Sequence, residues 1–245
     1  MKVLAIGNSF SQDATRYLHS IASNEGKRMK VVNLYIGGCS LERHYNNMLS
    51  GEDAYSMELC GMSSGFYVSL KEALLSDSWD FITIQQSSPK SVKMETYSPY
   101  AQRLCDFIRL HAPKAKLLIH QTWGYEEGSQ RLTEEMGYSH FVDMCKDAHD
   151  CYEQLAKDVD AYGIIPSGDV FVEMYNSGIR DIHRDTFHAS FGVGRYALAL
   201  TWFCYLYGER PQCPPIKLDK PVEEEELRLV TSCVERVVFG NLSEN

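Results

Sequence analysis

The sequence has no stretch rich in lysine and arginine, and its 24 basic residues are outnumbered by 33 acidic ones. The formal net charge of -9 repels the phosphate backbone of nucleic acids, so we expect no nucleic-acid partner. No apolar run approaches the roughly 20 residues that a transmembrane helix needs, which predicts a protein that does not span a membrane. No signal peptide precedes the first expected strand, which favours a cytoplasmic location, or export if a leader has been removed.

The eight cysteines include no CxxC pair and no spacing typical of zinc sites. Several of them, such as Cys105 and Cys204, lie within apolar periodic segments. This placement favours buried free thiols in a reducing compartment over disulfide bonds. The chain also lacks internal repeats, low-complexity tracts and any linker long enough to divide it, so residues 1–245 are predicted to form a single domain.

What the chain does contain is a regular alternation of strand-like and helix-like segments. The expected strands are 2–6, 29–36, 80–86, 115–122 and 163–166, and the expected helices are 12–25, 41–49, 67–76, 97–111, 138–161, 168–177, 192–207 and 221–238. The segment 50–66 is rich in Gly, Ser and Met and is interpreted as irregular. The alternation predicts an α/β fold, a three-layer α/β/α sandwich around a mostly parallel five-stranded sheet.

Small polar residues follow the expected strands, at the edge of the sheet where parallel α/β folds bind ligands. They occupy positions 8–9, 37–40, 85–88 and 120–123. Within the last group, His120 and Trp123 are candidates for lining a substrate pocket, with packing in the core as the alternative.

Ser9, directly after the first strand, allows two interpretations. A small hydroxyl between a strand and a helix is typical of a helix N-cap, whatever the function of the protein. A serine at the carboxyl end of a strand is alternatively a nucleophile, provided that a base elsewhere in the chain activates it. Ser11 lies nearer the expected helix and is the better N-cap candidate, which leaves Ser9 available for chemistry.

The densest cluster of titratable side chains lies at 181–188, far from Ser9 in the sequence. Asp185 and His188 are three residues apart, so the carboxylate can fix the imidazole tautomer and leave Nε2 free to accept a proton. Asp181 and His183 form a competing pair with a spacing of two. A third interpretation takes all four side chains as ligands of a divalent metal, although no HExxH pattern is present.

Taken in order, these motifs resemble the sequence blocks of the SGNH (GDSL-type) hydrolases over most of the chain. The matching residues are Gly7-Asn8-Ser9 for the Gly-Asp-Ser block, Asn33 followed by Gly38 for the second block, and Asp185-Thr186-Phe187-His188 for the last block. The resemblance implies a flavodoxin-like sandwich, a triad of Ser9, His188 and Asp185, and hydrolysis of carboxylic esters with neither cofactor nor metal. The implied substrates are small-molecule or carbohydrate esters with a short acyl group, such as O-acetyl.

One block departs from the pattern of that family. After the third strand the family usually has Gly-x-Asn, whose asparagine donates to the oxyanion, whereas this chain has Gln85 and Gln86. We expect one of these amides to join the backbone N–H groups of Ser9 and Gly38 in an oxyanion hole. Gln86 is favoured because it lies nearer the carboxyl end of the strand. Because this asparagine is missing, a second interpretation remains: a carbohydrate-binding protein with the same fold and no catalytic activity. The sequence does not predict the oligomeric state.

Overall fold

The computed structural model describes residues 1–240, and a seven-stranded sheet in the order β4-β3-β2-β1-β5-β6-β7 forms its centre. Five of these strands are parallel: β1 (Lys2–Gly7), β2 (Lys30–Tyr35), β5 (Phe81–Ile84), β6 (Lys116–His120) and β7 (Gly163–Ile165). They are the five strands expected from the sequence, and no end of a strand differs from expectation by more than two residues. The α/β fold class is confirmed.

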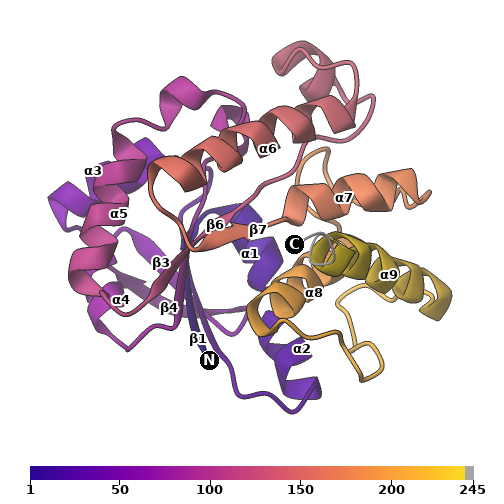
Figure 1. Cartoon of the computed structure of the whole chain (residues 1–245), viewed down its shortest axis with the longest axis horizontal. Helices are drawn as coiled ribbons and strands as arrows, with labels where there is room; N and C mark the ends of the chain where they lie inside the picture. The colour runs from indigo at the N-terminus through magenta and orange to yellow at the C-terminus, as the bar shows by residue number, and fades with distance from the viewer. Residues whose placement is uncertain (241–245) are drawn as a thin grey trace.

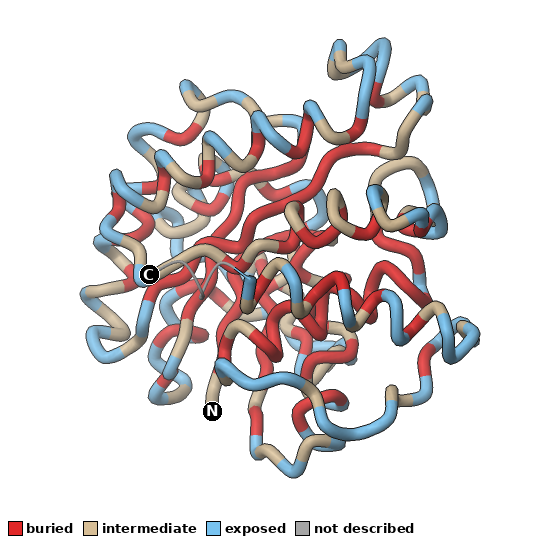
Figure 2. The backbone as a smooth tube through the Cα atoms, turned by 45° about the vertical axis from the view of Figure 1, so that its right-hand side comes forward, coloured by how far each residue is buried: buried red, intermediate tan, exposed pale blue. Residues whose placement is uncertain are grey.

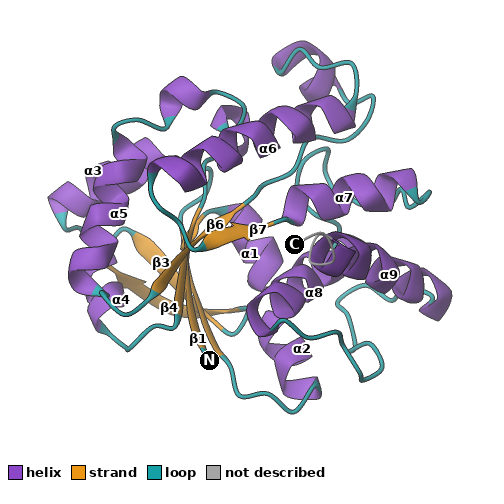
Figure 3. Ribbon diagram, in the orientation of Figure 1, coloured by secondary structure: helices purple, strands orange, loops and turns teal. Residues whose placement is uncertain are grey.

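The expected strand number was wrong, because β3 (Tyr55–Leu59) and β4 (Met62–Val68) extend the sheet as an antiparallel hairpin. Figure 3 shows both strands at one side of the sheet. Cys60 and Gly61 form the turn and both have positive φ, 51° and 79°, as type I′ hairpin turns require. Most of β4 is exposed or half-exposed, so the segment lacks the apolar and polar alternation that marks a strand in a sequence.

Helices cover both faces of the sheet, which gives three layers (Figure 1). One face carries α3 (Leu41–Ser50), α4 (Leu70–Leu75) and α5 (Tyr100–His111), and the other carries α1 (Ser9–Thr15), α2 (Leu18–Asn24), α7 (Ser167–Asn176), α8 (Val193–Tyr207) and α9 (Glu224–Gly240). The long helix α6 (Phe141–Asp158) contributes side chains to both apolar clusters. Within residues 1–240, no helix combines the length and the apolar character needed to cross a lipid bilayer.

The strands divide the core into two halves because successive side chains point to opposite faces. In β1, Val3 and Ala5 belong to one apolar cluster, whereas Leu4 and Ile6 belong to the other, and all four are fully buried. Figure 2 shows this buried backbone running through the middle of the molecule. A strand buried on both faces needs the continuous apolar run that 2–6 displays, and its end fixes where Ser9 lies.

The first helical region differs from the expected helix 12–25 in a way that matters for the site. It starts at Ser9, directly after β1, and is divided into α1 and α2. The N-cap is Asn8, whose side chain accepts from the Phe10 N–H, so the expectation that Ser11 caps the helix was wrong. The Ser11 hydroxyl instead contacts the Asn8 carbonyl and the Asn33 side chain, at 2.8 and 2.7 Å, inside the first turn.

Candidate active site

Ser9 is held at the carboxyl end of β1 by the hydrogen bonds of its neighbour Asn8. The Asn8 side chain is 2% exposed. Its Oδ1 accepts from the Phe10 N–H at 3.0 Å and from Gln85 Nε2 at 2.9 Å, and its Nδ2 donates to the Cys39 carbonyl at 3.0 Å. One amide therefore ties the backbone beside Ser9 to the two strand ends that flank β1.

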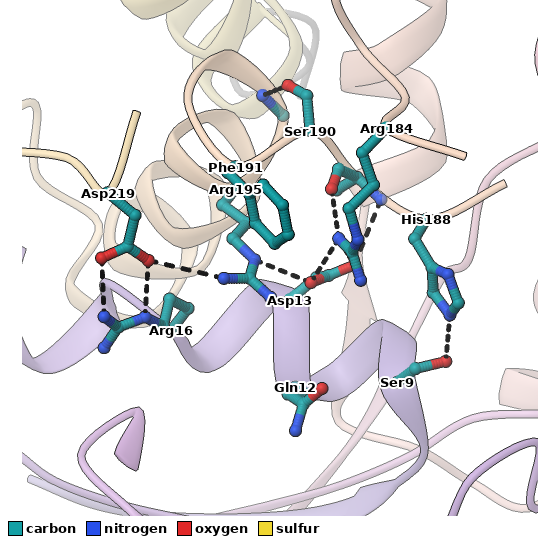
Figure 4. A network of polar contacts seen from close by, with 12 residues as sticks. Ser9, Gln12, Asp13, Arg16, Arg184, His188, Ser190, Phe191, Arg195 and Asp219 are labelled. Carbon is teal, nitrogen blue, oxygen red and sulfur yellow. Dashed lines mark hydrogen bonds and ion pairs between the residues drawn. The ribbon is translucent and has the colours of Figure 1, made fainter. Parts of the chain in front are cut away.

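The structure brings His188 to Ser9 from the other end of the chain (Figure 4), and Asp185 lies next to His188. His188 Nε2 lies 2.8 Å from Ser9 Oγ, although the two residues are 179 positions apart. On the opposite side of the ring, Nδ1 lies 2.9 and 3.0 Å from the two carboxylate oxygens of Asp185. A carboxylate only accepts, so Nδ1 carries the proton and Nε2 is free to accept the hydroxyl proton of Ser9.

The carboxyl group of Asp185 is suited to this role in its charged form. Burial raises its pKa, but hydrogen bonds from the side chain and backbone N–H of His188 outweigh this effect and hold the pKa below its usual range. The Asp185 side chain is 47% exposed and that of His188 is 18% exposed. The imidazole thus lies between a solvated carboxylate and the partly buried hydroxyl.

The turn that carries this pair contains backbone strain. Thr186 has a φ of 70°, a left-handed conformation that is unfavourable for a β-branched residue by about 1–3 kcal/mol. Two bonds from the body of the protein hold the turn: the Thr186 carbonyl accepts from the Glu126 N–H at 2.7 Å, and the Phe187 carbonyl accepts from Trp123 Nε1 at 2.8 Å. Strain held by surrounding contacts is typical of functional turns.

Trp123 and His120 do not line a pocket, contrary to the first of the two interpretations. Both are fully buried. Trp123 stacks on Phe10 with ring centres 4.0 Å apart, and His120 packs edge-on against Trp202 of α8. Burial lowers the pKa of His120 to about 3, so this ring is neutral. His120 is the last residue of β6, and Trp123 packs against Phe10, the residue after Ser9, so both side chains belong to the packed core next to the site.

The structure does not place either glutamine as an oxyanion donor. Gln85 accepts from His120 Nδ1 at 2.6 Å and donates to Asn8. Gln86 Oε1 accepts from the backbone N–H groups of Leu41 and Ser87, and its Nε2 donates to Thr96. Because both amides are engaged in buried hydrogen bonds, the weak preference for Gln86 over Gln85 at the reacting centre has no support in the geometry.

A cavity of about 310 Å³ opens beside Ser9. Its lining includes Ser9 and Gly38, as expected, and Ser87 and Ser88 from the polar group after the third expected strand. It also includes Tyr125 and Arg131, which the sequence did not single out. The Arg131 guanidinium lies 4.2 Å from the centre of the Phe187 ring, and its Nε is 3.8 Å from a Glu135 oxygen. The segment 124–137 has no strand or helix periodicity in the sequence, so only the folded chain brings it to Ser9.

The competing interpretations of 181–188 are not supported by the geometry. His183 Nε2 lies 3.0 Å from the Gly124 carbonyl, and burial lowers the pKa of this histidine to about 4. Asp181 forms an ion pair with Lys220 at 2.8 Å. Asp181 and His183 therefore have partners other than the Asp185–His188 pair, and residues 1–240 contain no cluster of three or more histidine, cysteine or carboxylate side chains arranged to hold a metal ion.

The sheet order and the helical layers on both faces of the sheet match the fold of the SGNH hydrolases. The sequence matches the family described as domain of unknown function DUF4886 over residues 2–232, and the chain belongs to that family. A crystal structure of a DUF4886 family protein from Bacteroides uniformis is 30% identical, with a TM-score of 0.89, and the match covers 98% of this chain and 96% of that one.

More distant solved structures share the fold alone. A candidate SGNH hydrolase from Slackia heliotrinireducens is 20% identical, with a TM-score of 0.58 and coverage of 83% of this chain and 97% of that one. A psychrotrophic esterase from Pseudoalteromonas, in a structure inhibited by monoethylphosphonate, is 11% identical, with a TM-score of 0.51 and coverage of 84% and 94%. Comparison with proteins of curated function gives no match.

Proposed function

We propose that this protein is a serine hydrolase that cleaves carboxylic esters. The observation that carries the proposal is the distance of 2.8 Å between His188 Nε2 and Ser9 Oγ, with the Asp185 carboxylate on the other ring nitrogen. A serine hydroxyl becomes an effective nucleophile when an oriented imidazole can take its proton. All three side chains are at hydrogen-bond distance before any substrate binds.

The proposed reaction has two steps. Ser9 Oγ attacks the acyl carbon, His188 takes the hydroxyl proton, and the same proton passes to the departing alcohol as the ester bond breaks. Water then attacks the acyl-enzyme, with His188 accepting a proton from the water and returning it to Ser9. Asp185 stabilises the imidazolium in both steps. These steps use only the side chains of the protein and water.

The oxyanion is proposed to bind to backbone N–H groups of Ser9 and Gly38. Both residues line the cavity, and Gly38 has a φ of 61°. Two correctly placed donors suffice for an oxyanion hole, so the engagement of Gln85 and Gln86 elsewhere does not remove this element.

The substrate is proposed to be an ester with a short acyl group, such as an O-acetyl group on a carbohydrate. A cavity of about 310 Å³ has room for a small acyl group and part of an alcohol. The hydroxyls of Ser87, Ser88 and Tyr125 can bond to sugar hydroxyls, and the charges of Arg131 and Glu135 offset one another. This lining and the net charge of -9 favour a neutral substrate over an anionic polymer.

The proposal is tested by Ser9→Ala, measured by hydrolysis of p-nitrophenyl acetate and by labelling with a fluorophosphonate. We expect rate loss of about 10⁴-fold or more and no labelling. Ser23→Ala, an exposed serine of α2, is the matched control and should keep both properties. If the Ser9→Ala variant hydrolyses the ester within tenfold of the wild type, Ser9 is not the nucleophile.

The substrate class is tested separately with p-nitrophenyl esters of increasing chain length and with acetylated xylo-oligosaccharides. The acetyl ester should give the highest kcat/KM of the series. A strong preference for octanoyl or longer chains would reject the short-acyl part of the proposal while leaving the triad in place.

A further inference from the structure

A buried carboxylate, Asp13, connects the helix of Ser9 to the loop of His188 (Figure 4). Asp13 lies four residues after Ser9 in α1 and is fully buried. Arg184 Nη1 donates to both of its oxygens at 2.9 Å, and Arg195 Nε donates to one of them at 2.8 Å. Residues four apart share a face of a helix, so this anchor is one turn from the candidate nucleophile.

The donors to Asp13 come from both sides of the Asp185–His188 pair. Arg184 immediately precedes Asp185, and Ala189 immediately follows His188. The Ala189 N–H donates to Asp13 Oδ2 at 3.1 Å, and Arg184 also donates to the Ala189 carbonyl. One carboxylate thus bonds to the residue directly before Asp185 and to the residue directly after His188.

The network continues beyond the loop and fixes Asp13 itself. Arg195 belongs to the first turn of α8, and its Nη1 lies 3.5 Å from Asp219. Asp219 in turn forms two hydrogen bonds with Arg16, at 2.7 and 2.8 Å. The guanidinium groups of Arg184 and Arg195 both lie against the Phe191 ring, with centres 4.8 and 4.7 Å away. Charged hydrogen bonds of this kind restrict orientation as well as distance.

We infer that Asp13 is a positioning residue that holds His188 at hydrogen-bond distance from Ser9, an inference that rests on the proposed function. The bond between Asp185 and His188 lies within one turn and cannot fix that turn relative to α1. The Ser9–His188 contact is a single hydrogen bond at the surface of the cavity. The buried bonds from Asp13 to Arg184 and Ala189 join the same two segments at several points, and Asp13 does not line the cavity.

A purely structural role for Asp13 makes a different prediction. A variant would then contain fewer folded molecules, and each folded molecule would still react at the wild-type rate. A positioning role lowers the rate of each folded molecule, because a displacement of about 1 Å at a reacting group costs about 10²-fold in rate. The substrate would still bind in the same cavity, so KM should change little.

The experiment compares Asp13→Asn with Asp77→Asn as a matched control. Asp77 also pairs with two cations, Lys2 and Lys30, but it lies at the opposite end of the strands. Active sites are counted by fluorophosphonate labelling and kcat is expressed per labelled site. We expect Asp13→Asn to lower kcat about 10²-fold with KM within threefold, and Asp77→Asn to leave kcat within twofold.

Arg184→Lys provides a second variant if Asp13→Asn does not fold, since it keeps the charge but loses the longer, planar guanidinium that contacts both Asp13 oxygens and the Ala189 carbonyl. A kcat per labelled site within threefold of the wild type, in any folded variant of Asp13 or Arg184, overturns the inference. A wild-type protein that neither labels nor hydrolyses esters rejects the proposed function instead. In that case, hydrogen exchange decides: faster exchange of the His188 and Ala189 amides in Asp13→Asn than in Asp77→Asn supports the positioning role, and equal exchange overturns it.

Discussion

The substitution Asn8→Asp, which restores the aspartate usual in the Gly-Asp-Ser block, should have a clear effect on the stability of the protein. In the folded protein the Asn8 Nδ2 donates to the Cys39 carbonyl at 3.0 Å, and Oδ1 accepts from Gln85 and from the Phe10 N–H. Asn8→Asp keeps the two acceptor functions and removes the donor. A carboxylate oxygen would then face the Cys39 carbonyl oxygen in a site that is 2% exposed.

The sizes of the opposing free-energy contributions decide whether Asn8→Asp stabilises or destabilises the protein. Leaving a buried carbonyl without its donor costs about 1–3 kcal/mol, and burial of the new charge adds to this. A carboxylate at a helix N-terminus gains about 0.3–1 kcal/mol, with the low end appropriate to a helix of only 7 residues. We therefore expect Asn8→Asp to lower the free energy of unfolding at pH 7 by about 2–3 kcal/mol, which corresponds to a rise of about two units in the pKa of the introduced carboxyl.

The pH dependence separates this explanation from a packing defect. The protonated carboxyl can donate to the Cys39 carbonyl, so the deficit grows as the pH rises from the unfolded pKa, about 3.9, to the raised folded value near 6. Urea unfolding should show about half the deficit at pH 5 that it shows at pH 7. Asn46→Asp, which makes the same charge change at an exposed position of α3, should shift stability by less than about 0.5 kcal/mol. A deficit for Asn8→Asp that is absent at pH 7, or equal at both pH values, would refute the reasoning.

Four further outcomes follow from the contacts of the site. The acid limb of kcat/KM should have a slope of one, because hydrogen bonds from His188 overcome the effect of burial and hold the pKa of Asp185 below its usual range, so this carboxylate stays ionised and adds no second titration; a slope of two would contradict this. Because the pKa of Asp185 is lowered in the folded protein, Asp185→Asn should destabilise the protein at neutral pH. Urea unfolding should show that this destabilisation shrinks as the pH falls below the ordinary carboxyl pKa of 3.8. Gln86→Ala should lower the free energy of unfolding by about 2–4 kcal/mol, since it leaves the N–H groups of Leu41 and Ser87 unpaired, and a kcat loss of 10²-fold at unchanged stability would instead make Gln86 an oxyanion donor. Trp123→Phe removes the bond to the Phe187 carbonyl and should lower unfolding stability by about 1–2 kcal/mol, and an unchanged thermal midpoint would show that this bond does not hold the turn.

The sequence predicts the parts of the molecule whose signal is local. The run 2–6 is apolar because β1 is buried on both faces, and the spacing of Asp185 and His188 is set by a single turn. The hairpin β3–β4 was missed because its exposed strand β4 lacks periodicity and its turn is Cys-Gly, in place of the usual Asn-Gly or Asp-Gly. A sequence pattern identifies a strand where burial forces apolar residues to recur at a regular spacing, and it fails where the strand is exposed.

Other parts of the site depend on contacts between distant segments. Asp13 is one polar residue on a short helix, and nothing in its neighbours indicates that two arginines more than 170 positions away bond to it. The directions of Gln85 and Gln86 depend on where β5 ends, at Ile84, which the sequence placed two residues too late. Once the strand stops at Ile84, the strict alternation of strand side chains no longer applies to either glutamine.

Asn8 stands where the Gly-Asp-Ser block has its aspartate, and Gln85 belongs to the block that departs from the SGNH pattern; the two side chains form a single arrangement. The neutral His120 donates from Nδ1 to Gln85 Oε1, Gln85 Nε2 donates to Asn8 Oδ1, and Asn8 Nδ2 donates to the Cys39 carbonyl. Gln85 and Asn8 each accept a hydrogen bond on the side-chain oxygen and donate one from the side-chain nitrogen. An amide can do both, whereas a carboxylate can only accept. An aspartate at position 8 would break the last link, and an alanine at position 85 would break the first two. The amides are therefore coupled to one another and to the buried His120, so their departure from the family pattern does not count as two separate arguments against catalysis at Ser9.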